Sequence, residues 1–517
     1  MQCLTRLTIF LCCAWILTLL YGEMIAYWIP LWACSWPKPP SNPSSVEDQV
    51  KVAFIADPQL MERTSLGLDP ESFALGAAQF FSDIYMRRSF VMSIMPFKPD
   101  VIVFLGDQFD GGPALTDQEW QESLSRFKHI FGLNDERRKS DVSVYYLSGN
   151  HDIGYSSIHA KYPKVLSRYE KEFGPRNYHF SAGTVEFVVV DAQTLDGSTQ
   201  GAETSLSWEF IKNISKVNPS KPRVLLTHIP LYHADETPCG PYRSSPIINQ
   251  RVLYSDPDHE ISYQNYLSKE TSSRLLDSIR PILVVSGHDH DQCTVTHTTP
   301  SGPVTEHTVG TVSWQQGNLY PSFMLLTATT SSNTTNSKDL ISTQQCFLPM
   351  QTHIYIWYLG QFIMTLVLLV IWPTNGFGCW NWLSECMNSI RSIRRNLVVS
   401  SKEKDDEDCE YEMIWDAEGS AHLVRRPTPK GPIAKSDLGP TGRGTVTIRQ
   451  TAKKTVVEEP ESSVSLDINT AKVPRLNKSK ARRFIGRLIR VFQLLTVIAA
   501  VNVPLYMMML FKDWIDR

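Results

Sequence analysis

The chain has 517 residues, which is enough for one large domain or for two to three smaller ones. Its formal net charge is −3, so its charge does not favour a nucleic-acid-binding protein, and no nucleic-acid partner is expected. Hydrophobic residues make up 42% of the chain and charged residues 20%, but this average hides three long apolar stretches. The sequence leaves the oligomeric state open.

These three stretches are long enough to cross a membrane, which takes about 20 apolar residues in a helix. The first covers about 7–32 and is too long for the core of a cleaved signal peptide, so an uncleaved signal anchor is predicted. The second covers 354–372 and the third 491–511. Glu23 interrupts the first stretch, either as a residue near the membrane interface or as a functional carboxylate.

Basic residues beside the apolar stretches predict the orientation in the membrane, because cytosolic flanks carry an excess of Lys and Arg. Arg391, Arg394 and Arg395 follow the second stretch, and six Lys or Arg residues between 478 and 490 precede the third. The segment between them is therefore predicted to be cytosolic, and the large segment before the second stretch lumenal. Two glycosylation sequons, at Asn213 and Asn333, lie in this lumenal segment and agree with the orientation.

The predicted organisation follows from these spans. Few aromatic residues and many charged, Pro, Ser, Thr and Gly residues between 400 and 471 predict disorder there. The parts are a cytosolic N-terminus with a signal-anchor helix (1–36), a lumenal domain (37–351), a second span (352–375), a cytosolic, largely disordered loop (376–490), a third span (491–511) and a short lumenal tail (512–517).

Within the lumenal segment, strand-like and helix-like patterns alternate at first and then become richer in strands. Strands are predicted at 50–57, 100–107, 142–147, 178–181, 185–191, 224–227, 282–286, 304–310 and 323–329. Helices are predicted at 73–95, 117–131, 159–173, 206–214 and 268–279. Early βαβ units followed by β-rich parts indicate an α/β domain of two packed sheets flanked by helices.

Short polar fragments close most of the apolar runs, where open α/β sheets place their sites. A single Gly-Asn-His-Asp fragment is more often a turn, but the whole set in this order predicts a two-metal phosphoesterase site. The fragments are Asp57-Pro58-Gln59, Gly106-Asp107-Gln108, Gly149-Asn150-His151-Asp152, His228 and Gly287-His288-Asp289-His290.

Hydrolysis of a phosphate ester requires neutralised phosphate charge and a nucleophile at neutral pH, and two cations can supply both. A carboxylate that bridges the two cations is required, and Asp107 is the candidate. Hard oxygen donors together with imidazoles suit Mn, Fe or Zn better than Ca. The candidate metal ligands are Asp57, Asp107, Asn150, His228, His288 and His290.

His151 is the candidate catalytic residue. It follows Asn150 directly, so its side chain points away from the metal if that of Asn150 points toward it, and it fits the role of general acid to the leaving alkoxide. Asp152 either orients His151 or is an exposed turn carboxylate. Asp110 either supports the Asp107 loop or is a turn residue.

Four cysteines lie in the lumenal segment, where disulfides can form, and they allow three pairings. Cys239 and Cys293 follow the strand ends of His228 and His290, which must converge on one metal cluster, so we expect these two to pair. Cys34 and Cys346 flank the first two spans and would then pair beside the membrane.

These fragments resemble the calcineurin-like metallophosphoesterase superfamily, whose pattern is D-x-H, GD, GNH[D/E], H and GHxH, over about residues 50–329. The resemblance implies an αββα sandwich, with Asp57, Asp107 and His290 on the first ion. It places Asp107, Asn150, His228 and His288 on the second. Gln59 stands where the superfamily usually has His, and its carbonyl oxygen is a possible but weaker ligand.

A narrower resemblance is to the membrane-anchored GPI-remodelling phosphoesterases of the early secretory pathway. It rests on Asp57-Pro58-Gln59-Leu60 and on GDQFDGG, GNHDIGY, CGPYR and SGHDHDQC. It implies removal of ethanolamine phosphate from mannose of GPI-anchor glycans with Mn²⁺, which aids maturation and ER-to-Golgi transport of GPI-anchored proteins. These proteins and the lipid membrane would be the partners, in the endoplasmic reticulum, the ER-Golgi intermediate or the cis-Golgi.

Two other functions stay open at this point. The first is a metallophosphatase that acts on phosphoproteins or nucleotides, which a cytosolic site would favour. The second is a non-catalytic membrane cargo adaptor that retains the fold, although a protein without catalysis has no need of the full ligand set and His151.

Overall fold

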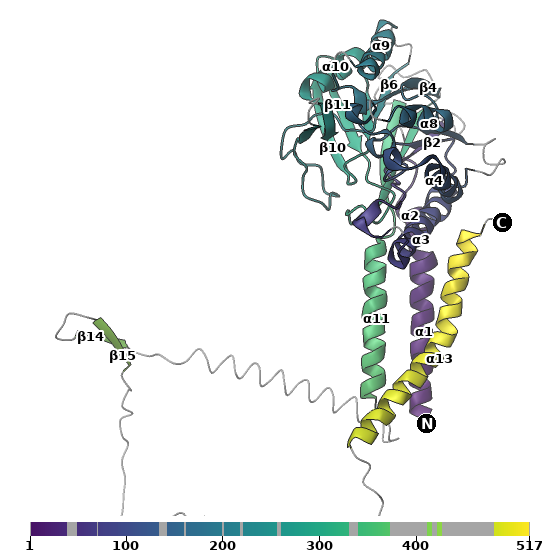
Figure 1. Cartoon of the computed structure of the whole chain (residues 1–517), viewed down its shortest axis with the longest axis vertical. Coiled ribbons are helices and arrows are strands. Elements are labelled where there is room, and N and C mark those ends of the chain that lie inside the picture. Colours follow the sequence, from purple (N-terminus) through teal and green to yellow (C-terminus); the bar gives the residue numbers. More distant parts are fainter. Residues whose placement is uncertain are drawn as a thin grey trace, which may run out of the picture. The chain divides into compact units, whose positions relative to one another are not determined.

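The structure is a computed structural model that describes residues 2–38, 49–69, 71–133, 142–159, 162–198, 201–217, 221–255, 260–329, 340–372, 411–415, 421–425 and 480–515 (Figure 1). The chain forms two compact units. One comprises residues 5–371 and 490–517, and the other comprises 1–4 and 372–489. The lumenal domain predicted from the sequence lies in the first unit.

Two mixed sheets form the centre of this unit. The first sheet has the strand order β13-β12-β1-β2-β3, with β1, β2 and β3 parallel and β12 antiparallel to both of its neighbours. Its strands are β1 (Gln49–Ile55), β2 (Val101–Phe104), β3 (Ser143–Tyr146), β12 (Ser322–Thr329) and β13 (Ile341–Phe347).

The second sheet has the order β10-β11-β9-β6-β5-β4. Its four central strands, β11, β9, β6 and β5, are parallel, and both edge pairs are antiparallel hairpins. The strands are β4 (Tyr178–Ala182), β5 (Val185–Val190), β6 (Arg223–Thr227), β9 (Leu283–Ser286), β10 (Cys293–Thr299) and β11 (Gly302–Thr308).

The two sheets pack face to face because their strands are apolar on both sides. Along β1, Val52 and Phe54 face the second sheet, where Phe54 packs against Phe187 of β5. Ala53 and Ile55 face the opposite way, into the core beneath the helices. Period-two alternation with both faces buried is typical of a strand inside a layered α/β domain.

Helices cover the two outer faces. The first sheet is covered by α3 (Phe73–Arg88), α4 (Asp117–Ile130) and α8 (Lys164–Phe173), and the second by α9 (Ala202–Lys216) and α10 (Lys269–Ile279). Thr116 begins α4 with a reciprocal capping box to Glu119. The four layers confirm the predicted αββα sandwich.

In the part of the chain that the structure describes, three helices are long and apolar enough to cross a membrane, at Leu4–Ala33, Gln351–Ile371 and Phe484–Trp514. The first consists of α1 (Gln2–Leu20), a π-helical turn (Tyr21–Ile25) and α2 (Ala26–Ala33). The second is α11 (Gln351–Ile371), and the third lies in α13 (Lys480–Trp514). All three apolar stretches seen in the sequence are therefore helical.

The first two of these helices meet the sandwich at one sheet edge. In the register of the first sheet, Phe54 of β1 lies opposite Met324 of β12, and Ser322 lies opposite Phe347 of β13. The carboxyl end of β1 therefore lies at the edge where β13 ends, and α11 begins a few residues beyond that point. The predicted Cys34–Cys346 disulfide is present and holds the end of α2 at the same edge.

A buried ion pair joins the helices to the domain. Glu23, in the π-helical turn, pairs with Arg88 at the end of α3, and both side chains are 2% exposed. Tyr358 of α11 donates to Glu23 over 2.8 Å, and Arg88 also pairs with Asp513 of α13 at 2.8 Å. The Glu23 carboxylate is thus held by an ion pair and a hydrogen bond, which favours a structural role over a functional carboxylate.

Some elements were not predicted. They are β10, β13, the hairpin of β7 (Val252–Ser255) and β8 (Glu260–Gln264), and the hairpin of β14 (Tyr411–Trp415) and β15 (Ala421–Arg425). The last hairpin lies in the segment predicted to be disordered, 400–471. The other residues of that segment are outside the described residues. The helix predicted at 73–95 ends at Arg88 and continues as a π-helical turn (Ser89–Ile94).

We expect Arg88→Met to destabilise the protein by about 3–5 kcal/mol, because it leaves the Glu23 carboxylate buried without its partner. Replacing both residues, with Glu23→Gln added, should recover part of the loss. Arg63→Met is the matched control, since its ion pair with Glu119 is 42% and 31% exposed and should contribute less than about 1 kcal/mol. Chemical unfolding of the detergent-solubilised chain measures the difference, and equal effects of the two single substitutions would contradict it.

Candidate metal centre

The predicted ligand residues all follow strand ends at one edge of the sandwich. Asp57, Asp107 and Asn150 follow β1, β2 and β3 of the first sheet. His228 follows β6 of the second sheet, and both His288 and His290 follow β9. Parallel strands of one sheet end at a common edge, so the two sheets together bring six side chains to one place.

Two overlapping groups of donor atoms result. Asp107, His228 and His288 have donor atoms within 4.8 Å of one another, and so do Asp57, Asp107 and His290. Asp107 is common to both groups, which is the arrangement that a carboxylate bridging two ions requires. Asn150 joins the first group, because its Oδ1 lies 3.1 Å from Nε2 of His228.

Backbone carbonyls fix which imidazole nitrogen faces each group. Nδ1 of His228 lies 2.8 Å from the carbonyl oxygen of Leu105, so that Nδ1–H donates and Nε2 is left toward Asp107. Nε2 of His288 lies 2.9 Å from the carbonyl oxygen of Gln264, which leaves Nδ1 as the ligand atom. Such hydrogen bonds on the far nitrogen orient metal-binding histidines.

The buried charges of the site suit cations. Burial lowers the pKa of His288 to about 3 and that of His290 to about 4, so both rings are neutral, which is the form that binds a metal. Burial raises the pKa of Asp57 to about 7. For His228, burial favours the neutral ring, but Asp107 outweighs it and raises the pKa to about 9, so a cation that binds its Nε2 has to displace a proton. These oxygen and imidazole donors fit a pair of divalent transition-metal ions.

The backbone at the site is strained. Five of the nine non-glycine residues with positive φ in the described part of the chain are here: Asp57, Gln59, Asp107, His288 and His290. Left-handed backbone of this kind costs about 1–3 kcal/mol per residue and gathers at functional sites. This backbone conformation turns the chain sharply after each of these strands, so that the side chains point toward the edge of the sheet.

Gly149 shows how closely the loops approach. A Cβ at this position would collide with Oδ1 and the amide nitrogen of Asp107. Any side chain at position 149 would therefore displace the carboxylate shared by the two groups. The requirement for glycine here is steric, since the φ of Gly149 is −110° and other residues adopt it.

His151 lies beside the cluster, where its Nδ1 is 2.5 Å from the backbone carbonyl of Asp110. This contact orients the ring and leaves Nε2 for a substrate. Burial alone would lower the pKa of His151, but the nearby carboxylate of Asp107 raises it above its ordinary value. A side chain that is 37% exposed and has a raised pKa fits the predicted role of general acid.

Asp152 has neither of the two roles considered from the sequence. It is 2% exposed, and its carboxylate accepts hydrogen bonds from the backbone N–H of Gly149 at 2.9 Å and Phe109 at 3.1 Å. It therefore ties the Asp107 loop to the Asn150 loop. Asp110, through its carbonyl, is the residue that orients His151.

Gln59 lies at the site with a buried side chain. Its Nε2 is 3.1 Å from Oδ2 of Asp107, and its backbone carbonyl accepts from Gln315 over 3.0 Å. Because a side-chain amide can turn by 180°, the same position can present Oε1 to a cation instead. Gln59, in place of His in the first motif, thus still offers an atom that can bind a metal ion.

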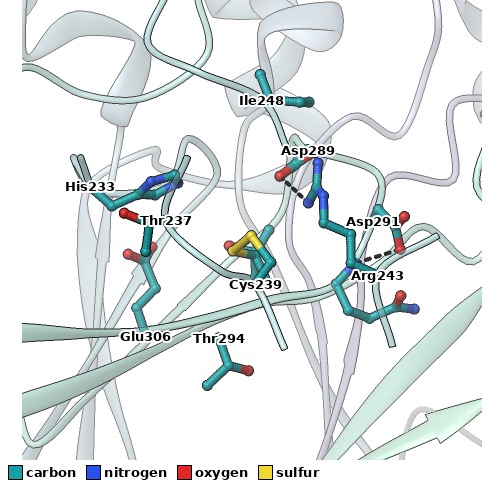
Figure 2. The surroundings of a disulfide bond; sticks show 12 residues. His233, Thr237, Cys239, Arg243, Ile248, Asp289, Asp291, Thr294 and Glu306 are labelled. Carbon is teal, nitrogen blue, oxygen red and sulfur yellow. Dashed lines mark hydrogen bonds and ion pairs between the residues drawn. A yellow bond between two sulfur atoms is a disulfide. The ribbon is translucent and has the colours of Figure 1, made fainter. Parts of the chain in front are cut away.

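The loop of residues 241–248 forms one wall of a cavity beside the site, which has a volume of about 440 Å³ and reaches His290. Arg243 makes a bidentate ion pair with Asp289, at 2.7 and 2.9 Å, and Asp291 accepts from the backbone N–H of Ser244 and Ser245. Figure 2 shows Arg243 reaching Asp289 close to Cys239.

Two details of this loop bear on the sequence predictions. The predicted disulfide of Cys239 with Cys293 is present and fixes the loop to β10. The buried Arg243–Asp289 pair was not predicted. The position of Asp289 between two predicted ligands was a signal that its carboxylate would be buried and would need a basic partner.

Replacement of Asp107 by Ala should abolish hydrolysis and remove both metals, because its carboxylate belongs to both donor groups. His151→Ala should keep the metal content and lower turnover by about 10²–10⁴, since only proton transfer is removed. Metal analysis of the purified variants together with phosphodiesterase kinetics tests both. Loss of metal from the His151 variant would show that His151 is a ligand.

Gln59→His should preserve or raise affinity at the first metal position, formed by Asp57, Asp107 and His290, because imidazole is a stronger ligand than an amide carbonyl for Mn or Zn. Titration of the metal-free protein with Mn²⁺ measures this. Weaker binding by the variant would argue against Gln59 in the coordination shell.

Comparisons with known proteins agree with this geometry. Residues 50–292 match the family model described as calcineurin-like phosphoesterase. Metallophosphoesterase 1 of Rattus norvegicus is 30% identical over 373 residues, which cover 68% of this chain and 86% of the relative. For Metallophosphoesterase 1 of Danio rerio the identity is 27%, and the matched region covers 71% of this chain and 92% of the relative.

A third relative is Cell division control protein 1 of Saccharomyces cerevisiae, which is 28% identical over 66% of this chain and 70% of its own length. These matches confirm the predicted family and enzyme class. The chain belongs to the calcineurin-like phosphoesterases, in the branch that contains Metallophosphoesterase 1, and is a metal-dependent phosphoesterase.

Proposed function

We propose that this enzyme removes ethanolamine phosphate from mannose of GPI-anchor glycans and so aids maturation and ER-to-Golgi transport of GPI-anchored proteins. Its two metal ions would be Mn²⁺. It would act in the membranes of the endoplasmic reticulum, ER-Golgi intermediate or cis-Golgi, with the catalytic domain in the lumen. The substrate and the metal come from the motif resemblance, above all Asp57-Pro58-Gln59 and the fragments that follow it.

One observation carries this proposal: the candidate metal centre lies at the sheet edge where the first candidate span ends and the second begins. Asp57 follows the carboxyl end of β1, α11 starts beyond the end of β13 at that edge, and Cys346 joins the edge to α2. A site in this position would face the membrane surface. Such a site suits a phosphoester on a glycan that is itself anchored in the membrane.

Contacts of the third helix support the predicted three-span orientation. Asp513, near the end of α13, pairs with Arg88 and accepts from Arg87 through its backbone carbonyl over 2.6 Å. The C-terminal end of α13 therefore contacts the domain, as a lumenal tail after a third span would. Asn213 lies on the exposed side of α9 and is accessible to glycosylation, whereas Asn333 is outside the described residues.

The residues of the site can perform the expected hydrolysis. When bound, the two ions would neutralise the phosphate and activate the attacking water. Asp107 would hold both ions, and Asp152 keeps the loops of Asp107 and Asn150 at a fixed separation. His151, oriented by the carbonyl of Asp110, would give a proton to the leaving mannose oxygen.

The other two functions receive less support. Phosphoproteins or nucleotides would be reached more easily by a site that faces away from the membrane. A cargo adaptor would not require the complete donor groups around Asp107 or the oriented ring of His151. The predicted lumenal orientation further separates the site from cytosolic phosphoproteins.

The test combines activity with orientation. The purified full chain with Mn²⁺ should release ethanolamine phosphate from a GPI glycan, and Asp107→Ala should abolish the release. In sealed microsomes the domain should resist external protease, and Asn213→Gln should remove a glycosidase-sensitive mass. Faster hydrolysis of a phosphopeptide or nucleotide than of the GPI glycan, or cleavage of the domain by external protease, would contradict the proposal.

A further inference from the structure

A groove of about 790 Å³ lies between the first two candidate spans and the sandwich. One of its walls consists of Met350, directly before α11, and a stripe of α11 formed by His353, Ile354, Trp357 and Tyr358. The spacing of these residues places them on one face of a helix.

The opposite wall comes from α1, the π-helical turn and α2, through Thr18, Tyr21, Ala26, Ile29, Pro30 and Ala33. A π-helical turn contains one more residue than an α-helical turn, so Ala26 rather than Ile25 continues the stripe. This wall spans about 22 Å along the helix, at 1.5 Å per residue, which is more than the hydrocarbon thickness of one bilayer leaflet, about 15 Å.

The two helices are held together beside the groove. Gly22 allows close approach, because a Cβ there would collide with the hydroxyl of Tyr358. Thr18 donates to Gln361 over 2.6 Å, and Trp15 donates to Thr365 over 3.1 Å. The groove is therefore built into a packed helix pair.

The groove and the cavity beside the metal centre share two chain segments. Pro241 and Tyr242 line the groove, and residues 245–248, a few positions later, line the cavity that reaches His290. Tyr320 lines the groove, and residues 316–318 line the cavity. One end of each segment therefore lines the groove, and the other end lines the cavity beside the metal centre.

Aromatic side chains mark the boundary between the groove and the cavity. Tyr242 and Tyr320 pack on Phe347, with ring centroids 5.0 and 6.1 Å apart, and they are 57% and 38% exposed. Tyrosines of this kind are typical of the membrane–water interface, where one end is apolar and the other wet. Arg243, the next residue after Tyr242, pairs with Asp289 in the metal loop.

We propose that the groove binds the lipid chains of the enzyme's own substrate, a glycosylphospholipid, while the glycan crosses the tyrosine boundary to the metal centre. This inference rests on the proposed function for the identity of the glycan. The occupant must be apolar, because candidate spans form both walls. Its head group must lie toward the sheet edge, because the groove reaches the end of β13 and Tyr242 there. A lipid-linked substrate meets both conditions.

Binding is tested with the full chain in phosphatidylcholine nanodiscs that contain a trace of photoreactive phosphatidylinositol, which is the lipid part of such a substrate. The matched variants are Ile29→Trp, which fills the groove, and Ile25→Trp, which does not line it. The two isoleucines are 39% and 37% exposed and lie one turn apart, so both variants add the same side-chain volume at a similarly exposed position. If Ile29→Trp misfolds, Ala33→Trp fills the same groove from an exposed position.

Crosslinking of phosphatidylinositol to peptides within 344–358 in the wild type and Ile25→Trp, with loss in Ile29→Trp, is the expected result. Equal crosslinking by photoreactive phosphatidylcholine would identify ordinary bilayer lipid as the occupant and would overturn the proposal. Absence of a crosslink in the wild type would overturn it as well. These readouts do not require catalysis, so they remain decisive if the GPI glycan is not hydrolysed.

Kinetics then separate the groove from the site. Ile29→Trp should raise KM for the lipid-linked glycan about tenfold, since excluding two methylene groups has an effect of this size. Hydrolysis of the water-soluble bis(p-nitrophenyl) phosphate should not change in either variant. Equal KM values of the two variants for the lipid-linked glycan would refute the groove, whereas wild-type activity on the soluble diester alone would refute only the proposed substrate.

Discussion

The position of the Asp107 carboxylate is the constraint on which the site depends. It belongs to both donor groups, it accepts a hydrogen bond from the backbone N–H of His151 at 2.8 Å, and it lies 3.3 Å from Nε2 of His228. Burial opposes its charge, but His228 and His151 overcome this and lower its pKa. Gly149 allows the second loop to approach it. Three loops from two sheets are thereby held by one side chain.

A second constraint is that the edge of the candidate metal centre is also the edge at which the first two candidate spans join the sandwich. The carboxyl ends of parallel strands determine where the ligands gather, and the antiparallel return through β12 and β13 delivers the chain to α11 at that edge. The Glu23–Arg88 pair and the Cys34–Cys346 bond add two further attachments of the first span. If the candidate spans cross a bilayer, these attachments leave the domain little rotational freedom relative to it, which would favour substrates that are confined to the same surface.

The site was largely predictable because its ligands end apolar runs, a signal that depends only on local pattern. The same logic predicted the pairing of Cys239 with Cys293. The Glu23–Arg88 pair was not predictable, because the partners are 65 positions apart and neither belongs to a motif. The role of Asp152 was missed because its partners are backbone N–H groups, which every non-proline residue has. Edge strands such as β13 were not predicted because polar residues interrupt their hydrophobic pattern.

The unfavourable free energy of the strained and buried site residues favours a metal-binding enzyme over a non-catalytic protein that only retains the fold. Five strained residues and a buried cluster of carboxylates and imidazoles are each unfavourable in isolation. Two divalent cations would compensate the carboxylate charge, and they would bind to the side chains that the strained backbone directs into the site. A protein that used only the outer surface of this fold would gain stability by relaxing Asp57 or Asp107 to ordinary backbone. The chain retains the strained, close-packed form, as an enzyme that needs the ions requires.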